Sequence, residues 1–298
     1  MNTDFIKGII PPIITPIDKN ELIDEARLRK QIDFIIKGGV HGILLFGSNG
    51  EFYMVDEDDM KRGLAIAVDH TKKRVPLYFG IGAIKTRKCI QLAQMAKAGG
   101  ADAISVLQPM FLKPNADELY QHFKAIAESV PGMPMLLYNN PGRVGYSMTG
   151  DLVAKLANDV ENIVGIKDSS GDMTLTSELI MLTAHKNFRV LGGKDTLIYG
   201  TLAHGGGGAV ATMANAFPEL TCSIYEKYVA GDIAGSLQAQ YKLNPLRFTL
   251  DKASFPVGTK DYAKLVGLDV GEPYLPSLSS KTPVLDAMKE KIKQANLP

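Results

Sequence analysis

The chain has 298 residues, of which 45% are hydrophobic and 22% are charged, and its formal net charge is +1 at pH 7. This is the composition of a globular protein with enough apolar side chains for a large core. A net charge this close to zero creates no long-range attraction for a polyanion, which argues against a nucleic-acid partner. No apolar run reaches 18 residues, so no membrane-spanning helix is expected.

Cysteine content and the start of the chain bear on the compartment. Cys89 and Cys222 lie far apart in segments with a helical pattern, so neither a disulfide framework nor a metal-binding knuckle is indicated. The first ten residues contain no basic segment followed by a long apolar stretch, which argues against an export signal. We therefore expect a cytoplasmic protein.

Eight short apolar segments recur along the chain, each with the composition of a buried strand. They cover residues 8–15, 42–47, 76–80, 102–109, 134–139, 163–167, 188–193 and 207–211. Between them, apolar residues recur three or four positions apart, as in amphipathic helices. Strands that alternate with helices predict βα units and a parallel sheet. Eight such units favour an α/β fold of the (β/α)8 TIM barrel type, with a doubly wound open sheet as the alternative.

From about residue 217 the pattern changes to helical segments without strands between them. The first, at 218–232, fits the last helix of the barrel, and three more follow at 234–251, 258–268 and 280–296. We therefore expect a catalytic barrel domain over residues 1–230 and a C-terminal helical extension over residues 231–298.

Functional groups of a barrel follow the carboxyl ends of its strands. In this chain those positions are Thr15 and the segments 47–51, 138–139, 167–169 and 193–195. They combine an amine, a phenol, hydroxyl groups, an amide and glycines that expose the backbone. We take this set as the candidate site.

Lys167 stands at the end of an apolar segment, directly after Ile166. Burial disfavours the ammonium form of a lysine, and the neutral amine is a nucleophile that can form a Schiff base with a 2-oxo acid. Such an imine withdraws electrons and makes the neighbouring carbon acidic. The alternative is that Lys167 extends into solvent and pairs with Asp168 or another acid.

Tyr138 ends the preceding strand segment, and neighbouring strands of a sheet lie about 4.8 Å apart. Its ring can therefore reach the space above Lys167, where a phenol can carry a proton in both directions. The alternative is a tyrosine that packs its ring and bonds a backbone carbonyl group.

Two features suggest sites for carboxylate groups. The turn with Gly47, Ser48 and Asn49 exposes backbone amides and side-chain donors, although the same residues are common in ordinary turns. Arg143, in the loop after Tyr138, suits a carboxylate through two parallel hydrogen bonds, unless it only faces solvent.

Two other kinds of site find no support in the sequence. The five histidines form no pair four residues apart with a third ligand, so no metal site is expected. The glycine-rich segment 204–210 lacks the Gly-Lys-Ser/Thr ending of a phosphate-binding loop and fits a helix end followed by a strand.

Five motifs, in this order, resemble those of the dihydrodipicolinate synthase and N-acetylneuraminate lyase family. They are GIIPPIITP (8–16), GSNGE (47–51), YNNPGR (138–143), GIKDSSGD (165–172) and LGGKD (191–195). The resemblance covers essentially the whole chain. It implies a class I aldolase on a (β/α)8 barrel with C-terminal helices, commonly a homotetramer, that requires no metal and no external cofactor.

The resemblance also implies a role for each residue of the candidate site. Lys167 would form the Schiff base, Tyr138 would relay the proton, and Ser48 with Asn49 would bind the carboxylate of pyruvate. Because Phe111 has no hydroxyl group, proton transfer is expected to run through Ser48, water or the substrate as well. Arg143 would receive the carboxylate of the incoming aldehyde, as in the synthase branch. The residues expected to bind substrate are Gly47, Asn49, Arg143, Ser169, Gly193 and Asp195.

Three departures separate the chain from the synthase branch. Phe111 stands where synthases carry a tyrosine that reaches a neighbouring subunit and completes the proton relay. Lys194 stands where synthases often have an acid, and its charge suits an anionic or polyhydroxylated acid. The segment 52–54 lacks the histidines of a lysine-binding site, so feedback by lysine is not expected.

The sequence therefore predicts a lyase in which Lys167 forms an imine with pyruvate or another 2-oxo acid. The reaction is either of the dihydrodipicolinate synthase kind or the cleavage of a 2-oxo-3-deoxy sugar acid to pyruvate and an aldehyde. Three alternatives remain: a dehydratase or deaminase that uses the same imine, a non-catalytic 2-oxo-acid binding protein, and a barrel enzyme of unrelated chemistry with a phosphate site.

Overall fold

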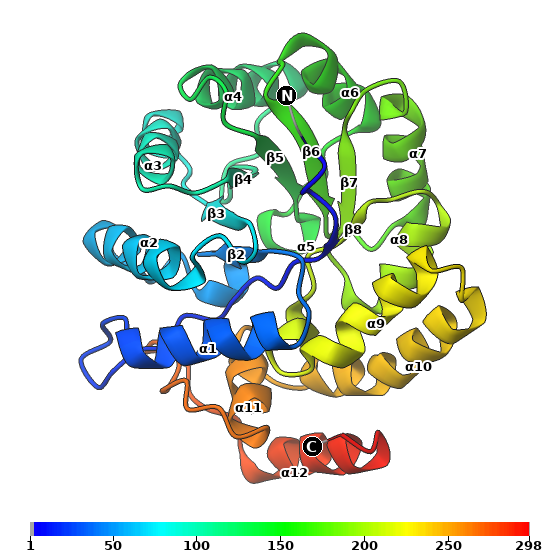
Figure 1. Ribbon diagram of the computed structural model, residues 1–298. Helices are drawn as coiled ribbons and strands as arrows, with labels where there is room; N and C mark the ends of the chain where they lie inside the picture. Colours follow the sequence, from blue (N-terminus) through cyan, green and yellow to red (C-terminus); the bar gives the residue numbers. More distant parts are fainter. Residues whose placement is uncertain (1–2, 298) are drawn as a thin grey trace.

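The computed structural model describes residues 3–297, and eight parallel strands lie at its centre, surrounded by helices (Figure 1). The strands are β1 (Gly8–Ile9), β2 (Ile43–Leu45), β3 (Leu77–Ile81), β4 (Ala103–Leu107), β5 (Met135–Asn139), β6 (Ile163–Asp168), β7 (Arg189–Gly192) and β8 (Gly208–Ala209). Each overlaps one of the eight segments expected from their apolar composition.

The sheet closes into a barrel. Its strand order is β1-β8-β7-β6-β5-β4-β3-β2, and the chain just after β1 pairs with β2 between Pro12 and Leu44. The Leu44 amide donates to the Pro11 carbonyl oxygen and the Ile13 amide to that of Leu44, both at 2.9 Å. The expected barrel is therefore confirmed, and the alternative of a doubly wound open sheet is wrong. β1 is shorter than the expected 8–15, because the two prolines have no N–H group to donate.

The strands are apolar on both faces because each face is covered. Successive side chains of a strand point to opposite sides. One set packs inside the barrel and the other against the helices. The interior set takes residues from all parts of the sheet: Ile10, Leu44, Tyr78, Ala103, Leu136, Val164, Leu191 and Val210. This packed interior leaves room for ligands only at the ends of the strands.

The barrel helices form the ring around the strands in Figure 1. They are α1 (Glu25–Lys37), α2 (Glu57–Thr71), α3 (Thr86–Ala98), α4 (Ala116–Glu128), α6 (Gly150–Asp159), α7 (Met173–Thr183), α8 (Ile198–Ala203) and α9 (Pro218–Val229). The loops hold short pieces: α5 (Pro141–Val144) and the 3-10 turns η1 (Ser48–Gly50), η2 (Asp195–Leu197) and η3 (Thr212–Asn215). Side-chain caps begin several helices; at α4, Asn115 and Glu118 form a reciprocal capping box.

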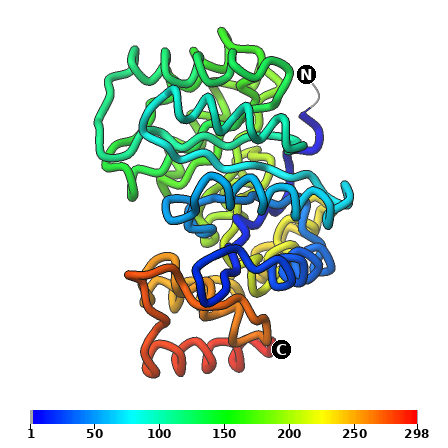
Figure 2. The backbone as a smooth tube through the Cα atoms, turned by 90° about the vertical axis from the view of Figure 1, so that its left-hand side faces the viewer, coloured from blue at the N-terminus to red at the C-terminus, as the bar shows by residue number. Residues whose placement is uncertain are grey.

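The C-terminal helical extension consists of α10 (Ile233–Leu250), α11 (Val257–Leu265) and α12 (Thr282–Gln294). Figure 2 shows these helices, coloured orange to red, together at the lower end of the molecule. The Tyr262 hydroxyl group donates to the Leu246 carbonyl oxygen at 3.0 Å and joins α11 to α10. The expected domain division at residue 230 falls between α9 and α10, which pack against each other.

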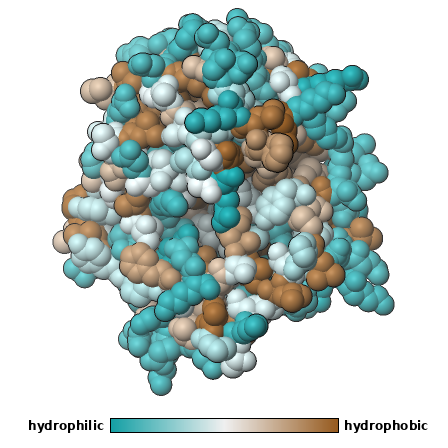
Figure 3. All heavy atoms as spheres, turned by 180° about the vertical axis from the view of Figure 1, so that it is seen from behind, coloured by the Kyte–Doolittle hydropathy of each residue, from teal (hydrophilic) through white to brown (hydrophobic). Residues whose placement is uncertain are grey.

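The surface mixes residue types. On the face opposite to that of Figure 1, hydrophilic and hydrophobic residues are interspersed, with hydrophilic ones along much of the rim (Figure 3). Cys89 and Cys222 are both buried and free. Within residues 3–297, no helix is both long enough and apolar enough to cross a membrane.

Candidate active site

A cavity of about 400 Å³ lies at the carboxyl ends of the strands, where a barrel carries its functional groups. Its walls come from η1, from the ends of β5, β6 and β7, and from the chain around the end of α10. The expected site residues that line it are Ser48, Asn49, Tyr138, Arg143, Lys167, Ser169, Gly193 and Asp195. Gly47, the ninth, precedes Ser48 in the turn but is not part of the wall.

Lys167 and Tyr138 are direct neighbours across two strands. Residue 167 of β6 is the register partner of residue 138 of β5. The Lys167 side chain is buried, with 3% of the residue exposed, and its Nζ lies 3.9 Å from the centroid of the Tyr138 ring. Among the described residues no carboxylate group forms an ion pair with Lys167. The alternative of a lysine that extends into solvent is therefore wrong.

The carboxylate of Asp168 is occupied elsewhere. It accepts hydrogen bonds from Asn139 Nδ2 at 2.8 Å, from the Ser170 hydroxyl group at 2.8 Å and from the Thr176 hydroxyl group at 3.0 Å. These bonds tie the end of β6 to β5 and to the start of α7. Asp168 thus holds the strand end that carries Lys167, without neutralising the amine.

The Tyr138 hydroxyl group is embedded in polar contacts. Burial alone would raise its pKa, but the positive charge of Lys167 and hydrogen bonds with Ser48 and Ser169 outweigh that effect and lower the pKa. The hydroxyl oxygen also accepts a hydrogen bond from Asn140 Nδ2 at 2.8 Å. A phenol with a lowered pKa is suited to proton transfer near neutral pH. Sequence reasoning missed Asn140, although it belongs to the YNNPGR motif.

The turn at η1 lines the cavity with Ser48 and Asn49. Only glycine fits at residue 50, because a Cβ there would lie 2.9 Å from the Ile13 carbonyl oxygen. The Asn49 side chain is used within the protein: its Nδ2 donates to the Thr212 hydroxyl group, and its Oδ1 accepts from the Thr259 hydroxyl group, both at 3.0 Å. The hydrogen bonds of residues 3–297 leave the amides of Ser48 and Asn49 unused. The backbone amide of Asn49 is therefore free for a ligand, while its side chain already has two partners in the protein.

Asp195 lines the cavity, but both of its carboxylate oxygens have partners in the protein. Oδ1 accepts from the Met213 amide at 2.7 Å and Oδ2 from Arg247 Nε at 3.1 Å. Burial raises the pKa of Asp195, although the positive charge of Arg247 opposes this. Arg247 also pairs with Asp251, one turn later in the chain. Asp195 therefore shapes the cavity chiefly by holding the chain around it.

Two exposed cations stand at the mouth of the cavity. The Arg143 guanidinium group lies 3.8 Å from the centroid of the Phe255 ring, a cation–π contact. The Lys194 side chain packs against Gly171: a Cβ atom added to this glycine would lie 3.5 Å from Lys194 Cε, which is van der Waals contact. In the part of the chain that the structure describes, neither cation has a carboxylate partner. The mouth is therefore electrostatically suited to an anionic ligand group.

The dihydrodipicolinate synthetase family matches residues 5–295 of the chain. The protein belongs to this family. A 4-hydroxy-tetrahydrodipicolinate synthase of Methanopyrus kandleri is 34% identical over 293 residues, which are 98% of this chain and 97% of the relative. One of Methanoculleus marisnigri is 36% identical over 274 residues, which are 91% and 93% of the two chains.

Solved structures of the family have the same fold. A prophage protein of the dihydrodipicolinic acid synthase family from E. coli K12, in complex with pyruvate, superposes with a TM-score of 0.94 at 31% identity, covering 98% of this chain and 99% of the other. The dihydrodipicolinate synthase of Thermotoga maritima also gives 0.94, at 27% identity and the same coverage. This member of the family is thus a lyase, a pyruvate-dependent enzyme of the Schiff-base aldolase type.

The C-terminal helical extension contributes to the wall of the candidate site. Arg247, Leu250, Asp251, Ala253 and Phe255 all line the cavity. Sequence reasoning placed the site on the barrel alone and missed them. Spacing offered one signal, since Arg247 and Asp251 lie four residues apart on a helix, but such pairs are common on solvent-exposed faces.

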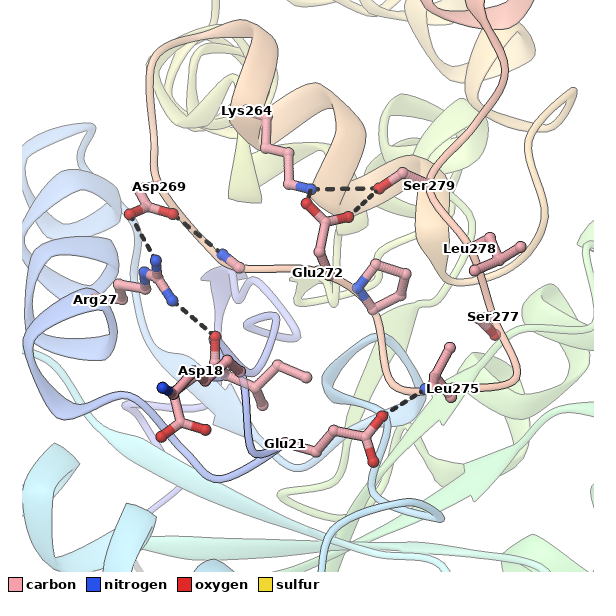
Figure 4. A pocket seen from close by; sticks show the side chains of 14 residues that line it. Asp18, Glu21, Arg27, Lys264, Asp269, Glu272, Leu275, Ser277, Leu278 and Ser279 are labelled. Atoms are coloured by element: carbon pink, nitrogen blue, oxygen red, sulfur yellow. Dashed lines mark hydrogen bonds and ion pairs between the residues drawn. The ribbon is translucent and has the colours of Figure 1, made fainter.

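A larger cavity, of about 660 Å³, lies between the loop near residue 18 and the segment 264–279 (Figure 4). There Arg27 pairs with Asp269 at 2.9 Å and Lys264 with Glu272 at 2.6 Å. Those cations are already neutralised, and none of the expected site residues lines this cavity. Across residues 3–297, no three His, Cys, Asp or Glu side chains are grouped so as to hold a metal ion.

Proposed function

We propose that Lys167 forms the imine with the keto carbon of pyruvate, and that Tyr138 moves the protons of the reaction. The observation that carries this proposal is the buried Lys167 Nζ, 3.9 Å from the centroid of the Tyr138 ring and without a carboxylate partner among the described residues. A buried amine that no acid neutralises is the group that imine chemistry needs.

The steps follow from the chemistry of the two groups. The neutral amine of Lys167 attacks the keto carbon and gives a carbinolamine, which loses its hydroxyl group as water with a proton from Tyr138 and becomes an iminium ion. The Tyr138 phenolate left by this step takes a proton from the methyl carbon, which gives an enamine. The enamine carbon then bonds to the aldehyde carbon, the aldehyde oxygen takes the proton back from Tyr138, and water hydrolyses the iminium ion to release the product and Lys167. The reverse of this sequence cleaves an aldol product. No metal and no external cofactor takes part in this mechanism.

The turn at η1 is proposed to bind the carboxylate of the 2-oxo acid. The amides of Ser48 and Asn49 have no other acceptor in residues 3–297, and Gly47 lets the backbone approach. The Ser48 hydroxyl group, which hydrogen-bonds Tyr138, would link the carboxylate end of the substrate to the proton relay. Ser169 and Gly193, joined by a hydrogen bond of 3.3 Å, would form the opposite wall.

For the second substrate we propose an aldehyde with its own carboxylate group, as in 4-hydroxy-tetrahydrodipicolinate synthases. Arg143 and Lys194 at the mouth support this choice, as do the names of the relatives. Phe111 favours a second candidate, cleavage of a 2-oxo-3-deoxy sugar acid, because it lacks the hydroxyl group of the synthase relay. Activity with an acidic aldehyde, compared with a polyhydroxylated one, separates these candidates.

We also propose a homotetramer in the cytoplasm. Phe111 is 94% exposed and Leu112 51%, an unusual display of apolar surface that a second copy would cover. Sedimentation analysis at several protein concentrations tests the assembly. Replacement of Phe111 by Ser should weaken it if this surface lies between subunits.

The mechanism is tested by intact-mass spectrometry after incubation with pyruvate and sodium borohydride, which reduces an imine to a stable amine. We expect one covalent adduct on the parent protein and none on Lys167→Ala. The control is Lys155→Ala, which removes an exposed lysine that pairs with Asp159 and should leave the full adduct. An adduct that persists in Lys167→Ala would refute the role of Lys167. A parent protein that forms no adduct would favour a 2-oxo-acid binding protein.

A further inference from the structure

Glu51 and Lys260 form an ion pair inside the protein. Their side chains are each 2% exposed, and Lys260 Nζ lies 2.7 Å from Glu51 Oε2. Lys260 Nζ also donates to the Glu272 carbonyl oxygen at 2.9 Å, and Glu51 Oε1 accepts from the Tyr274 amide at 3.2 Å. Neither side chain belongs to the wall of the active-site cavity. Any effect of the pair on the site therefore passes through the chain that carries it.

A buried ion pair adds little to stability, because removing two charges from water offsets most of their attraction. Its position in the chain indicates another role. Glu51 follows η1 directly and has a φ of +53°, and Phe46, just before the turn, has a φ of +51°. This left-handed conformation is uncommon for residues other than glycine, and contacts that constrain the residue favour it. The bonds of the Glu51 carboxylate supply such a constraint at one end of the turn.

The neighbour of Lys260 on α11 makes a second contact with the same turn. The Thr259 hydroxyl group donates to Asn49 Oδ1 at 3.0 Å, across 210 positions of sequence. Between the two anchored residues, the Gly50 carbonyl oxygen accepts from the Thr15 hydroxyl group at 2.7 Å. Helix α11 thus contacts the turn on both sides of Gly50: Thr259 bonds Asn49, and Lys260 pairs with Glu51.

We propose that Thr259 and Lys260 are positioning residues, which hold the amides of Ser48 and Asn49 in place for the carboxylate of the 2-oxo acid. This inference rests on the proposed function, since it assumes that the turn binds that carboxylate. It assigns the C-terminal helical extension a part in substrate affinity. The barrel supplies the reacting groups, whereas α11 sets the geometry of the turn opposite them.

The test measures the rate of borohydride trapping at a series of pyruvate concentrations. In Glu51→Gln/Lys260→Met both charges are removed, so no lone charge stays buried. We expect its half-saturating pyruvate concentration to rise about tenfold, the scale of a small misplacement of a binding group. The maximal trapping rate should change less than about twofold, because Lys167 and Tyr138 keep their positions.

Thr259 offers a milder test that does not depend on the double variant folding. Thr259→Val removes the hydroxyl group at nearly constant volume and should raise the half-saturating concentration about fivefold. Thr259→Ser retains the hydroxyl group and should behave like the parent. Lys264→Met is the matched control: Lys264 lies on the same helix, and the ion pair that it loses is with the carboxylate of Glu272, beyond the end of α11, and not with the turn (Figure 4).

Each outcome decides between explanations. If Thr259→Val saturates at the parent concentration of pyruvate, the positioning role is wrong while the imine mechanism stands. The same holds if all variants, Lys264→Met included, lose affinity together, since the effect would then be general destabilisation. A parent protein that traps no pyruvate would instead overturn the proposed function, and this inference with it.

Discussion

Lys167 and Tyr138 occupy paired positions on adjacent parallel strands, and the amine faces the ring at 3.9 Å from its centroid. Because the two residues share the register of β5 and β6, their relative position is set by backbone hydrogen bonds and not by a flexible loop. An amine and a phenol held in this way can exchange protons with one bound substrate.

Tyr138→Phe removes the hydroxyl group and keeps the ring over Lys167. We expect kcat to fall by about 10² to 10⁴, the range of general acid–base catalysis, with a much smaller change in KM for pyruvate. Steady-state kinetics and the rate of borohydride trapping measure the two effects. A kcat within a factor of two of the parent value would exclude Tyr138 as the proton carrier.

Arg143→Ala tests the recognition of an acidic aldehyde. The guanidinium group stands at the mouth of the cavity, stacked on the Phe255 ring and without a carboxylate partner among the described residues. Loss of one charge-assisted contact should raise KM for an aldehyde with a carboxylate group by about tenfold or more. The KM for a neutral aldehyde of similar size should change much less. An equal rise in KM for both aldehydes would show that Arg143 does not bind the carboxylate group.

Arg247→Met leaves the carboxylate of Asp195 buried without its cation, since Asp195 is 2% exposed. We expect the free energy of unfolding to fall by about 3 kcal/mol, as for other broken buried pairs. Asp195→Asn/Arg247→Met removes both charges, and the amide oxygen can still accept from the Met213 amide. Urea unfolding should therefore find the double variant more stable than Arg247→Met. The opposite order would mean that the ion pair is not the source of the loss.

His122 makes stability depend on pH. It is buried, its Nδ1 lies 2.9 Å from the Thr86 hydroxyl oxygen, and desolvation lowers its pKa from 6.5 to about 4. Between these values the unfolded chain binds a proton that the folded protein does not. The free energy of unfolding should therefore decrease as the pH falls from 6.5 toward 4, by up to about 3 kcal/mol from this group.

The matched variant for this effect is His122→Gln, which carries no titrating group at that position. Urea midpoints of both proteins at about pH 7 and about pH 4.5 provide the comparison, since this interval spans the titration of the unfolded histidine. We expect the parent protein to lose more stability over this interval than the variant. Parallel losses in the two proteins would assign the pH dependence to other groups.

Much of the architecture is predictable because it is local. A strand covered on both faces must be apolar along its length, so apolar composition is enough to locate β1 to β8. The pairing of Lys167 with Tyr138 follows in the same way, since consecutive βα units place consecutive strands side by side. The five motifs then indicate the family, because their order and spacing match the strand ends.

Local patterns in the chain are thus sufficient to predict the barrel, the pairing of Lys167 with Tyr138 and the family. They do not reveal which polar side chains of the candidate site are free to bind a ligand. Tertiary packing decides this, because it supplies some of them with partners in the protein. The Asn49 side chain and the Asp195 carboxylate, both expected to bind substrate, already have partners at Thr259 and Arg247. Those partners lie in the C-terminal helical extension, 210 and 52 positions away along the chain. No local pattern records such contacts, because packing of the extension on the barrel is what brings them together.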